Sequence, residues 1–312
     1  MDKYIGDIIT EQREDTRNTD IEALSESRIL RYNQYAQDRI FSLISISYNW
    51  AFEKTIVVPL VANQEEYTIA DNLAFGTRIS NVEFSAESDG KYIPLTTTPD
   101  RYTQLLHAGR PRFYKRRQGS ILIEPIPSSS QGSLRITYER ALDKLALRVG
   151  RIDGTPSGTD LDLSYTGEEP TTANEALFVE NTYVCVTDPF GTPLLYNGII
   201  ASYNAGTDVI TLTGNVEDYL VTGKTLADLD GAYVTLGKYT CTHSSLPSEA
   251  ENYFIEWVCR KLHNVDDSDQ YRETEILLNE MLESIVASFK FADKARKSFP
   301  IHDFEILIPE YD

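Results

Sequence analysis

The residues most suggestive of chemistry are Thr222-Gly223-Lys224-Thr225, which look like the end of a phosphate-binding P-loop. In that motif another glycine stands five places before Gly223, because the backbone must wrap closely around the phosphate oxygens. Asp218 occupies that place here. We therefore interpret the four residues as part of a β turn and assign them no nucleotide.

A second candidate is the acidic cluster Asp266, Asp267 and Asp269, which raises the hypothesis of a calcium site. An EF-hand loop needs a glycine at its sixth position and a glutamate at its twelfth. Counting from either Asp266 or Asp267 finds a leucine at the twelfth position. We favour a polar connection that caps the neighbouring helices.

The histidines and cysteines form no pattern of a metal site or a nucleophile. Zinc ligands, redox pairs and nucleophile elbows need close and regular spacing, and these residues are scattered. The residues are His107, His243, His263, His302, Cys185, Cys241 and Cys259. Paired carboxylates for glycoside hydrolysis cannot be chosen among so many acids without geometry. We expect buried, reduced thiols, no catalytic residue, no cofactor and no metal.

Composition limits the partners. The 312 residues include 48 acidic and 29 basic side chains, a net charge of -19, and 41% are hydrophobic. Such a chain can bury a core, but its field repels phosphate backbones, so specific binding to nucleic acid is disfavoured. An acidic protein can still line a conduit in which DNA slides. No apolar run approaches the roughly 18 residues of a membrane span, and no signal-peptide core is present.

The elements that would position any site begin with a long helix. Residues 1–18 are charged, and we expect a flexible N-terminal arm there. Thr19-Asp20-Ile21-Glu22 matches a capping box, which predicts a helix from about Asp20. The following residues recur at helical spacing and predict one buried face: Ile29, Asn33, Ala36, Ile40, Leu43 and Ser47.

From Ile56 the period changes to that of strands. Segments 56–61 and 67–69 predict a pair of strands, and segments 78–84 and 92–95 flank a turn and predict a hairpin. Two more strands, 120–124 and 134–138, flank a serine-rich loop. We expect a small antiparallel β module packed against the helix.

Residues 146–245 are rich in turn formers and short strands, including a hairpin around 204–208. We expect an inserted all-β domain, a small sandwich or barrel. A carbohydrate-binding module is a weaker hypothesis for this region.

The C-terminal part predicts two helices and a tail. Ser248 and Glu251 form a second capping box, and apolar residues at helical spacing run through Leu282 and Ile285, which favours an αα-hairpin. Pro300 ends the helical pattern. The tail 298–312 carries the apolar residues of a docking segment: Phe299, Phe304, Ile306 and Ile308. Such a segment can add to a partner's sheet edge or fold back onto its own domain.

One basic run, residues 110–117, stands out. In a strand, Arg112 and Arg116 would point one way and Lys115 and Arg117 the other, which divides the patch between two faces. Neutralisation of nearby carboxylates and charge pairing with an acidic neighbouring subunit are equally good interpretations. Contact with DNA ranks third.

In this order, the segments resemble the head-to-tail connector, or adaptor, proteins of tailed bacteriophages. The resemblance covers about residues 20–145 and 246–290. It rests on the long helix, the start of the helix pair at Leu246-Pro247, and four further segments: 48–52, 66–69, 111–114 and 119–127. It implies an α+β fold whose helical core, the long helix plus the αα-hairpin, belongs with the β module to one connector core domain, 19–145 and 246–297.

The resemblance also implies a function. We expect a non-enzymatic virion protein that forms a ring of about twelve copies beneath the portal, joins head to tail and extends the DNA channel. Its partners would be the portal, tail or neck proteins and further copies of itself, in the host cytoplasm during assembly and in the virion neck afterwards. The alternatives are another phage neck or tail component and, third, a peptidoglycan-cleaving virion enzyme.

Overall fold

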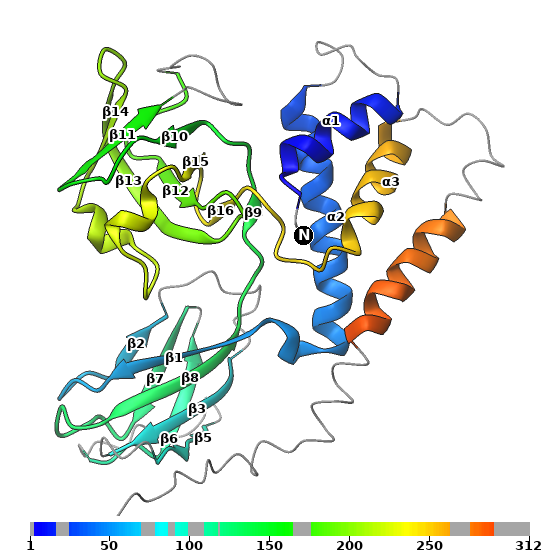
Figure 1. The fold of residues 1–312 in the computed structure, drawn as a ribbon. Coiled ribbons are helices and arrows are strands. Elements are labelled where there is room, and N and C mark those ends of the chain that lie inside the picture. The colour runs from blue at the N-terminus through cyan, green and yellow to red at the C-terminus, as the bar shows by residue number, and fades with distance from the viewer. Residues whose placement is uncertain are drawn as a thin grey trace, which may run out of the picture. The chain divides into compact units, whose positions relative to one another are not determined.

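The computed structural model describes residues 3–16, 25–69, 79–86, 91–98, 109–117, 119–164, 176–262 and 275–289. Over these ranges the chain is a mixed α+β protein with several sheets, one of them a closed barrel (Figure 1). It divides into two compact units. Ile44–Leu142 form the β unit, and Met1–Leu43 with Asp143–Asp312 form the helix-barrel unit. The predicted connector core domain is therefore divided between the two units.

The β unit contains two four-stranded sheets. The first has the order β1 (Glu53–Pro59), β8 (Ser133–Glu139), β3 (Ile79–Ser85), β4 (Ile93–Pro94), and every pairing is antiparallel. The second has the order β2 (Glu66–Thr68), β7 (Ser120–Glu124), β6 (Phe113–Arg117), β5 (Thr96–Thr97), with β5 parallel to β6. A short 3-10 helix, η1 (Asn49–Phe52), precedes β1.

One apolar core serves both sheets, because alternate side chains of their strands point inward between the sheets. Tyr67, Ile121 and Ile123 come from the second sheet, and Leu134 and Ile136 from the first. The module is thus a sandwich rather than a single small sheet. The predicted hairpin of β3 and β4 is confirmed. The predicted pairing of segments 56–61 and 67–69 is wrong, because β1 pairs with β8 and β2 with β7.

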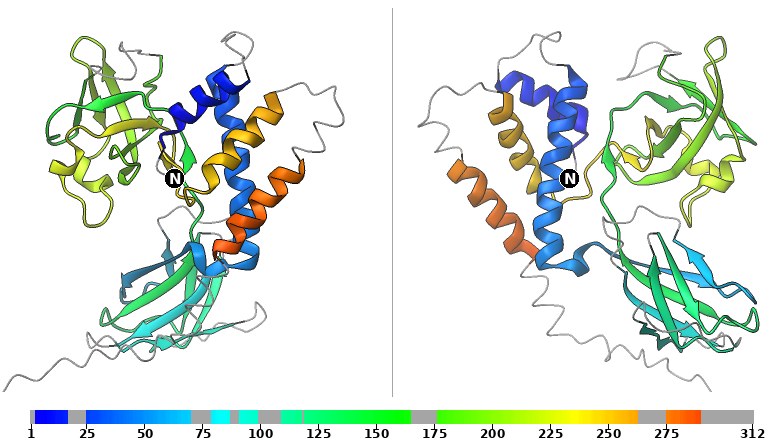
Figure 2. Two further views of the ribbon diagram at one scale, coloured as in Figure 1. Left: turned by 45° about the vertical axis from the view of Figure 1, so that its right-hand side comes forward. Right: turned by 180° about the vertical axis from the view of Figure 1, so that it is seen from behind.

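The helix-barrel unit holds helices α1 (Ile5–Asp15), α2 (Glu26–Ser47, whose last four residues belong to the β unit), α3 (Ala250–Leu262) and a further helix over residues 275–289 (Figure 2). The expectation of a flexible arm is wrong for residues 5–15. Ile5, Ile8, Ile9 and Gln12 are buried on one face of α1, as the spacing of three and four residues allows. The first helix is part of the core.

A buried amide pair joins three helices. Gln12 of α1 and Asn33 of α2 are fully buried and exchange two hydrogen bonds of 2.9 Å, each amide nitrogen donating to the other oxygen. Gln12 Nε2 also donates to the Phe254 carbonyl in α3, at 3.2 Å, and Asn33 Nδ2 to the Ile29 carbonyl, at 3.1 Å. Every described polar atom of the two side chains thereby has a partner.

The buried face of α2 departs from the predicted stripe at its C-terminal end and at Gln37. Ile29, Asn33, Ala36 and Ile40 are buried as predicted, whereas Leu43 is 39% exposed. Gln37, which is not part of the predicted stripe, is buried and donates to the Asp143 carbonyl at 2.8 Å. The predicted helix start at Asp20 lies outside the described residues.

The barrel lies within the range predicted for an inserted domain. Its closed order is β10 (Gly150–Ile152), β11 (Asp160–Ser164), β14 (Val209–Leu212), β13 (Pro193–Asn204), β12 (Tyr183–Thr187), β15 (Tyr233–Leu236), all pairings antiparallel. The hairpin at 204–208 is confirmed as the turn between β13 and β14. Two 3-10 helices, η2 (Val216–Tyr219) and η3 (Leu226–Leu229), follow β14. The domain boundaries at 146 and 245 stay a prediction.

The chain enters and leaves the barrel through adjacent strands. β9 (Lys144–Leu145) pairs in parallel with β16 (Thr240–Cys241). Beside this two-stranded sheet, the Arg148 guanidinium lies 3.8 Å from the ring centroids of both Tyr4 and Tyr233. This cation–π contact joins the start of α1 to the barrel.

Candidate docking surfaces

The residues considered for chemistry have structural roles where the structure describes them. Gly223 has φ +85°, which suits a turn, and Thr225 caps η3. The Thr225 backbone N–H and hydroxyl bind the Asp228 carboxylate at 2.7 and 2.8 Å and lower its pKa. The turn interpretation of this segment is confirmed.

The three thiols are buried and unpaired by disulfides, as predicted. Burial raises the pKa of Cys241 and of Cys259 to about 12, so both stay protonated and unreactive. In the part of the chain that the structure describes, no cluster of metal-ligating side chains occurs. Asp266, Asp267, Asp269 and the histidines other than His243 lie outside it.

The basic strand β6 is partly neutralised within its own unit. Lys115 Nζ lies 2.7 Å from Glu124 Oε1 of β7, and both side chains are largely buried. Arg117 lies 3.5 Å from Glu66 of β2 in an exposed pair. Arg116 Nη2 donates to the Tyr114 hydroxyl at 3.3 Å, and neither Arg116 nor the exposed Arg112 forms an ion pair with another described residue. Charge pairing with a neighbouring subunit thus stays a prediction, best supported for Arg112 and Arg116.

A pocket of about 170 Å³ opens on the β unit. Leu60, Phe84, Pro111 and Pro127 supply apolar side chains, and serines and Gln131 lie around them. Arg110, also in the lining, places its guanidinium 5.3 Å from the Phe84 ring centroid. The Gly109 backbone N–H donates to the Ile126 carbonyl at 2.8 Å, which holds the two sides of the pocket together.

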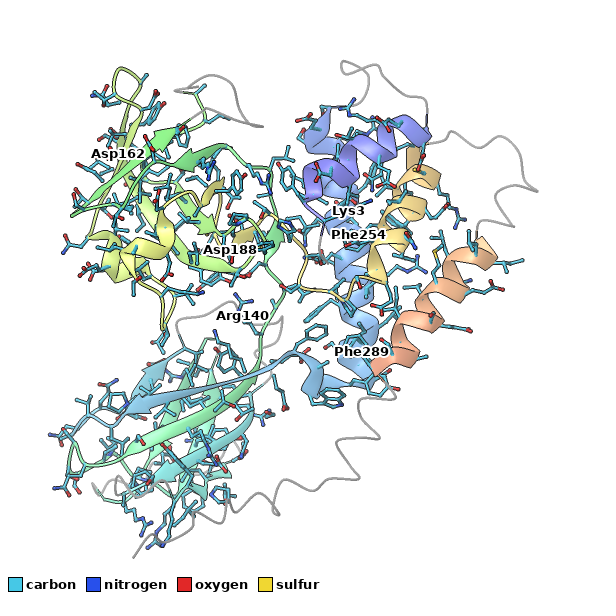
Figure 3. All side chains as sticks on the ribbon, viewed as in Figure 1. Lys3, Arg140, Asp162, Asp188, Phe254 and Phe289 are labelled. Atoms are coloured by element: carbon cyan, nitrogen blue, oxygen red, sulfur yellow. The ribbon has the colours of Figure 1, made fainter. Side chains whose placement is uncertain are left out.

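The barrel carries an exposed aromatic residue on a tight turn between β12 and β13. Phe190 is 84% exposed. Asp188 begins the turn (Figure 3). Its Oδ1 accepts hydrogen bonds from the backbone N–H of Phe190 at 2.9 Å and from that of Thr192 at 2.6 Å. Phe190 is not among the site residues predicted from the sequence. Its signal was the turn sequence Asp188-Pro189-Phe190-Gly191, but a turn alone does not reveal exposure.

The predicted docking residues of the tail, Phe299, Phe304, Ile306 and Ile308, lie outside the described residues. None of the helices in the described part of the chain has the length and apolarity that crossing a membrane requires.

An α+β chain with a pocket, an exposed aromatic turn and a partly unpaired basic strand has the features of a structural or binding protein. Comparison with protein families agrees with this class: the family model described as SU10 adaptor protein matches residues 4–166. The match covers more than half of the 312 residues, so the chain belongs to this family. This confirms the resemblance to phage head-to-tail adaptors and indicates a structural protein of the virion. A search of curated proteins found no match.

The matched range differs from the range of the resemblance. It includes α1 and ends after β11, the second strand of the barrel. The family pattern therefore extends into the region interpreted as an insertion.

Proposed function

We propose that this protein forms a ring beneath the phage portal, joins the head to the tail and extends the DNA channel. Membership in the SU10 adaptor family, over residues 4–166, is the observation that carries the proposal. The ring has about twelve copies in cyclic symmetry, in which each subunit meets its two neighbours through two different surfaces. The protein has no catalytic role in this proposal.

The charge of the chain supports a conduit. A net charge of -19 repels the phosphate backbone, so DNA passes without specific binding. The proposed partners are the portal on one side and tail or neck proteins on the other. Arg112 and Arg116 are proposed to pair with acidic groups of the neighbouring subunit. Assembly takes place in the host cytoplasm and leaves the protein in the virion neck.

The tail is proposed to dock on the portal or on a neighbouring subunit. Phe304, Ile306 and Ile308 alternate with Glu305 and Leu307, so a strand would present three apolar side chains on one face. A lone strand cannot bury that face, and addition to a partner's sheet edge or groove would do so.

The test is reconstitution with purified portal. The protein and portal are mixed, separated by sedimentation and imaged by electron microscopy. A ring bound to the portal, with cyclic symmetry in averaged images, is the expected result. A protein that binds only tail proteins, or that never binds portal, would contradict the proposal.

The tail is tested by deleting residues 299–312. We expect the unfolding temperature of the monomer to change little and ring formation on the portal to be lost. A matched pair of point variants separates face from length: Ile306→Ser should weaken portal binding, whereas Leu307→Ser, on the opposite face, should not. A large fall in unfolding temperature, or undiminished portal binding after deletion, would refute docking by the tail.

A further inference from the structure

Hydrogen bonds hold the backbone of the turn that carries Phe190. Besides the two bonds to Asp188 Oδ1, the Asp188 backbone N–H donates to the Thr192 carbonyl at 2.9 Å, and the Gly191 N–H to the Asp188 carbonyl at 3.0 Å. Gly191 has φ +82°, and a β-carbon there would lie 2.4 Å from the His243 side chain. The Cys241 thiol also donates to the Gly191 carbonyl, at 2.9 Å.

Single exposed apolar side chains are common on protein surfaces and by themselves mean little. A hydrogen-bonded turn differs, because its backbone is already ordered and loses little conformational entropy when the aromatic side chain is bound. Aromatic residues are enriched where protein surfaces meet, and a few such anchors supply most of the binding energy. Phe190 therefore has the properties of an anchor.

The pocket of the β unit has room for such an anchor and offers it apolar side chains among polar ones. A cavity of about 150 Å³ lined by apolar side chains accommodates benzene. The pocket, at about 170 Å³, can accept one phenyl ring against Leu60, Pro111 and Pro127. Arg110 adds a cation beside the ring, and guanidinium groups stack favourably on aromatic faces.

The charges of the two regions are complementary. Residues 146–245, which include the barrel, hold 13 acidic and 4 basic side chains. The β unit, residues 44–142, holds 10 acidic and 11 basic side chains, so it is nearly neutral although the whole chain has a net charge of -19. An acidic barrel and a basic-edged pocket attract each other, and like-charged pairings of barrel with barrel are disfavoured.

We propose that the partner of the pocket is a second copy of this chain, whose Phe190 turn inserts into it. The contact joins two different surfaces, so it is heterologous, and repetition with the right rotation closes a ring. The inference rests on the proposed ring and names the contact between its subunits. Asp188 belongs to the same turn, and its negative charge would be attracted by the positive charge of Arg110 in the pocket.

The test compares variants that differ at each side of the contact. Phe190→Ala removes the anchor, and Ser129→Trp fills the pocket from its lining. Their matched controls are Val179→Ala, an exposed apolar residue elsewhere in the barrel region, and Val57→Trp, an exposed residue of β1 outside the pocket. Ring formation on portal is measured as the protein concentration that gives half-maximal assembly.

We expect Phe190→Ala and Ser129→Trp each to raise that concentration about tenfold or more, since loss of an interface anchor has effects of this size. In combination they should cost little more than either alone, because both remove the same contact. The controls should stay within about twofold of the natural protein. Thermal unfolding of each variant monomer should be unchanged, which shows that folding is intact.

A photoreactive phenylalanine analogue at position 190 identifies the partner directly. Cross-links between two copies, at residues 109–111 or 127–131, support the inference. Cross-links within one copy, or to the portal, overturn it. If the natural protein forms rings and Phe190→Ala assembles equally well, the inference fails while the proposed function stands. If the natural protein forms no ring, both fail.

Discussion

The Gln12–Asn33 amide pair allows a quantitative test of how α1 is held. In Gln12→Leu, Asn33 Oδ1 loses its donor in a fully buried place, and Asn33 Nδ2 loses one of its two acceptors and keeps the Ile29 carbonyl. Each stranded buried group costs about 1 to 3 kcal/mol, so we expect a loss of about 3 kcal/mol in the free energy of unfolding. Asn33→Ala strands Gln12 Oε1 in the same way, while Gln12 Nε2 keeps the Phe254 carbonyl, and it should cost a similar amount.

The double variant, Gln12→Leu with Asn33→Ala, removes both polar groups and keeps their combined volume nearly unchanged. Replacing both partners by apolar groups is close to neutral, so the loss should be about 1 to 2 kcal/mol rather than the additive 6 or so. Thr10→Ala, an exposed position on the same helix, serves as the control and should stay within about 0.5 kcal/mol.

Urea unfolding followed by the fluorescence of Trp257 provides the measurement. The chain has two tryptophans, so a Trp50→Phe background leaves Trp257 of α3 as the reporter. Its ring lies 6.5 Å from that of Tyr32 in α2, edge to face. A double variant as unstable as the sum of the single ones would refute the reciprocal pairing. A Gln12→Leu loss below about 0.5 kcal/mol would refute the burial of α1.

Three further predictions concern other parts of the chain. Leu282 is buried in the helix over residues 275–289, so Leu282→Ala should lower the free energy of unfolding in denaturant by about 2 to 5 kcal/mol. Leu277→Ala, on the exposed face of the same helix, should lower it far less. When a flexible linker of about ten residues replaces residues 150–236, unfolding should stay cooperative, since closing a loop of this length costs little. The linker needs this length because β9 and β16 are adjacent but parallel, so a tight turn cannot join them. Loss of cooperativity would show a shared core. Burial, and then Arg148, lower the pKa of His243 below its ordinary value of about 6.5, so the unfolded chain takes up the proton first. Stability should therefore fall as pH decreases from about 7 to 5.5, and His243→Gln should reduce that slope in thermal unfolding; an equal slope in both proteins would exclude His243 as the cause.

Local patterns predicted elements well and their partners poorly. Strand alternation and turn residues located β3, β4, β13 and β14 with their hairpins, since those pairings join neighbouring segments. The pairing of β1 with β8 joins segments some 80 residues apart, and no local signal specifies it. The first helix was missed because its charged residues outweighed three isoleucines at helical spacing.

The docking surfaces were predicted least. The alternation of β6 was expected from the strand period, but the partners of Lys115 and Arg117 depend on which strands lie beside it. Phe190 and the pocket depend on exposure, which arises from tertiary packing rather than from residue type. A sequence can mark a turn, but it does not state which side chain the turn leaves in solvent.

The position of α1 has a consequence for synthesis on the ribosome. The Ile5 backbone N–H donates to the Thr242 carbonyl at 3.0 Å, and Gln12 to the Phe254 carbonyl, 242 positions along the chain. At about 5 to 20 residues per second, translation from one of these partners to the other takes roughly 12 to 50 seconds. Over that time α1 can contact α2, but it lacks the Thr242 and Phe254 segments that complete its native surroundings. The burial of α1 is therefore completed only after α3 has been made, and a nascent chain needs protection at α1 until then.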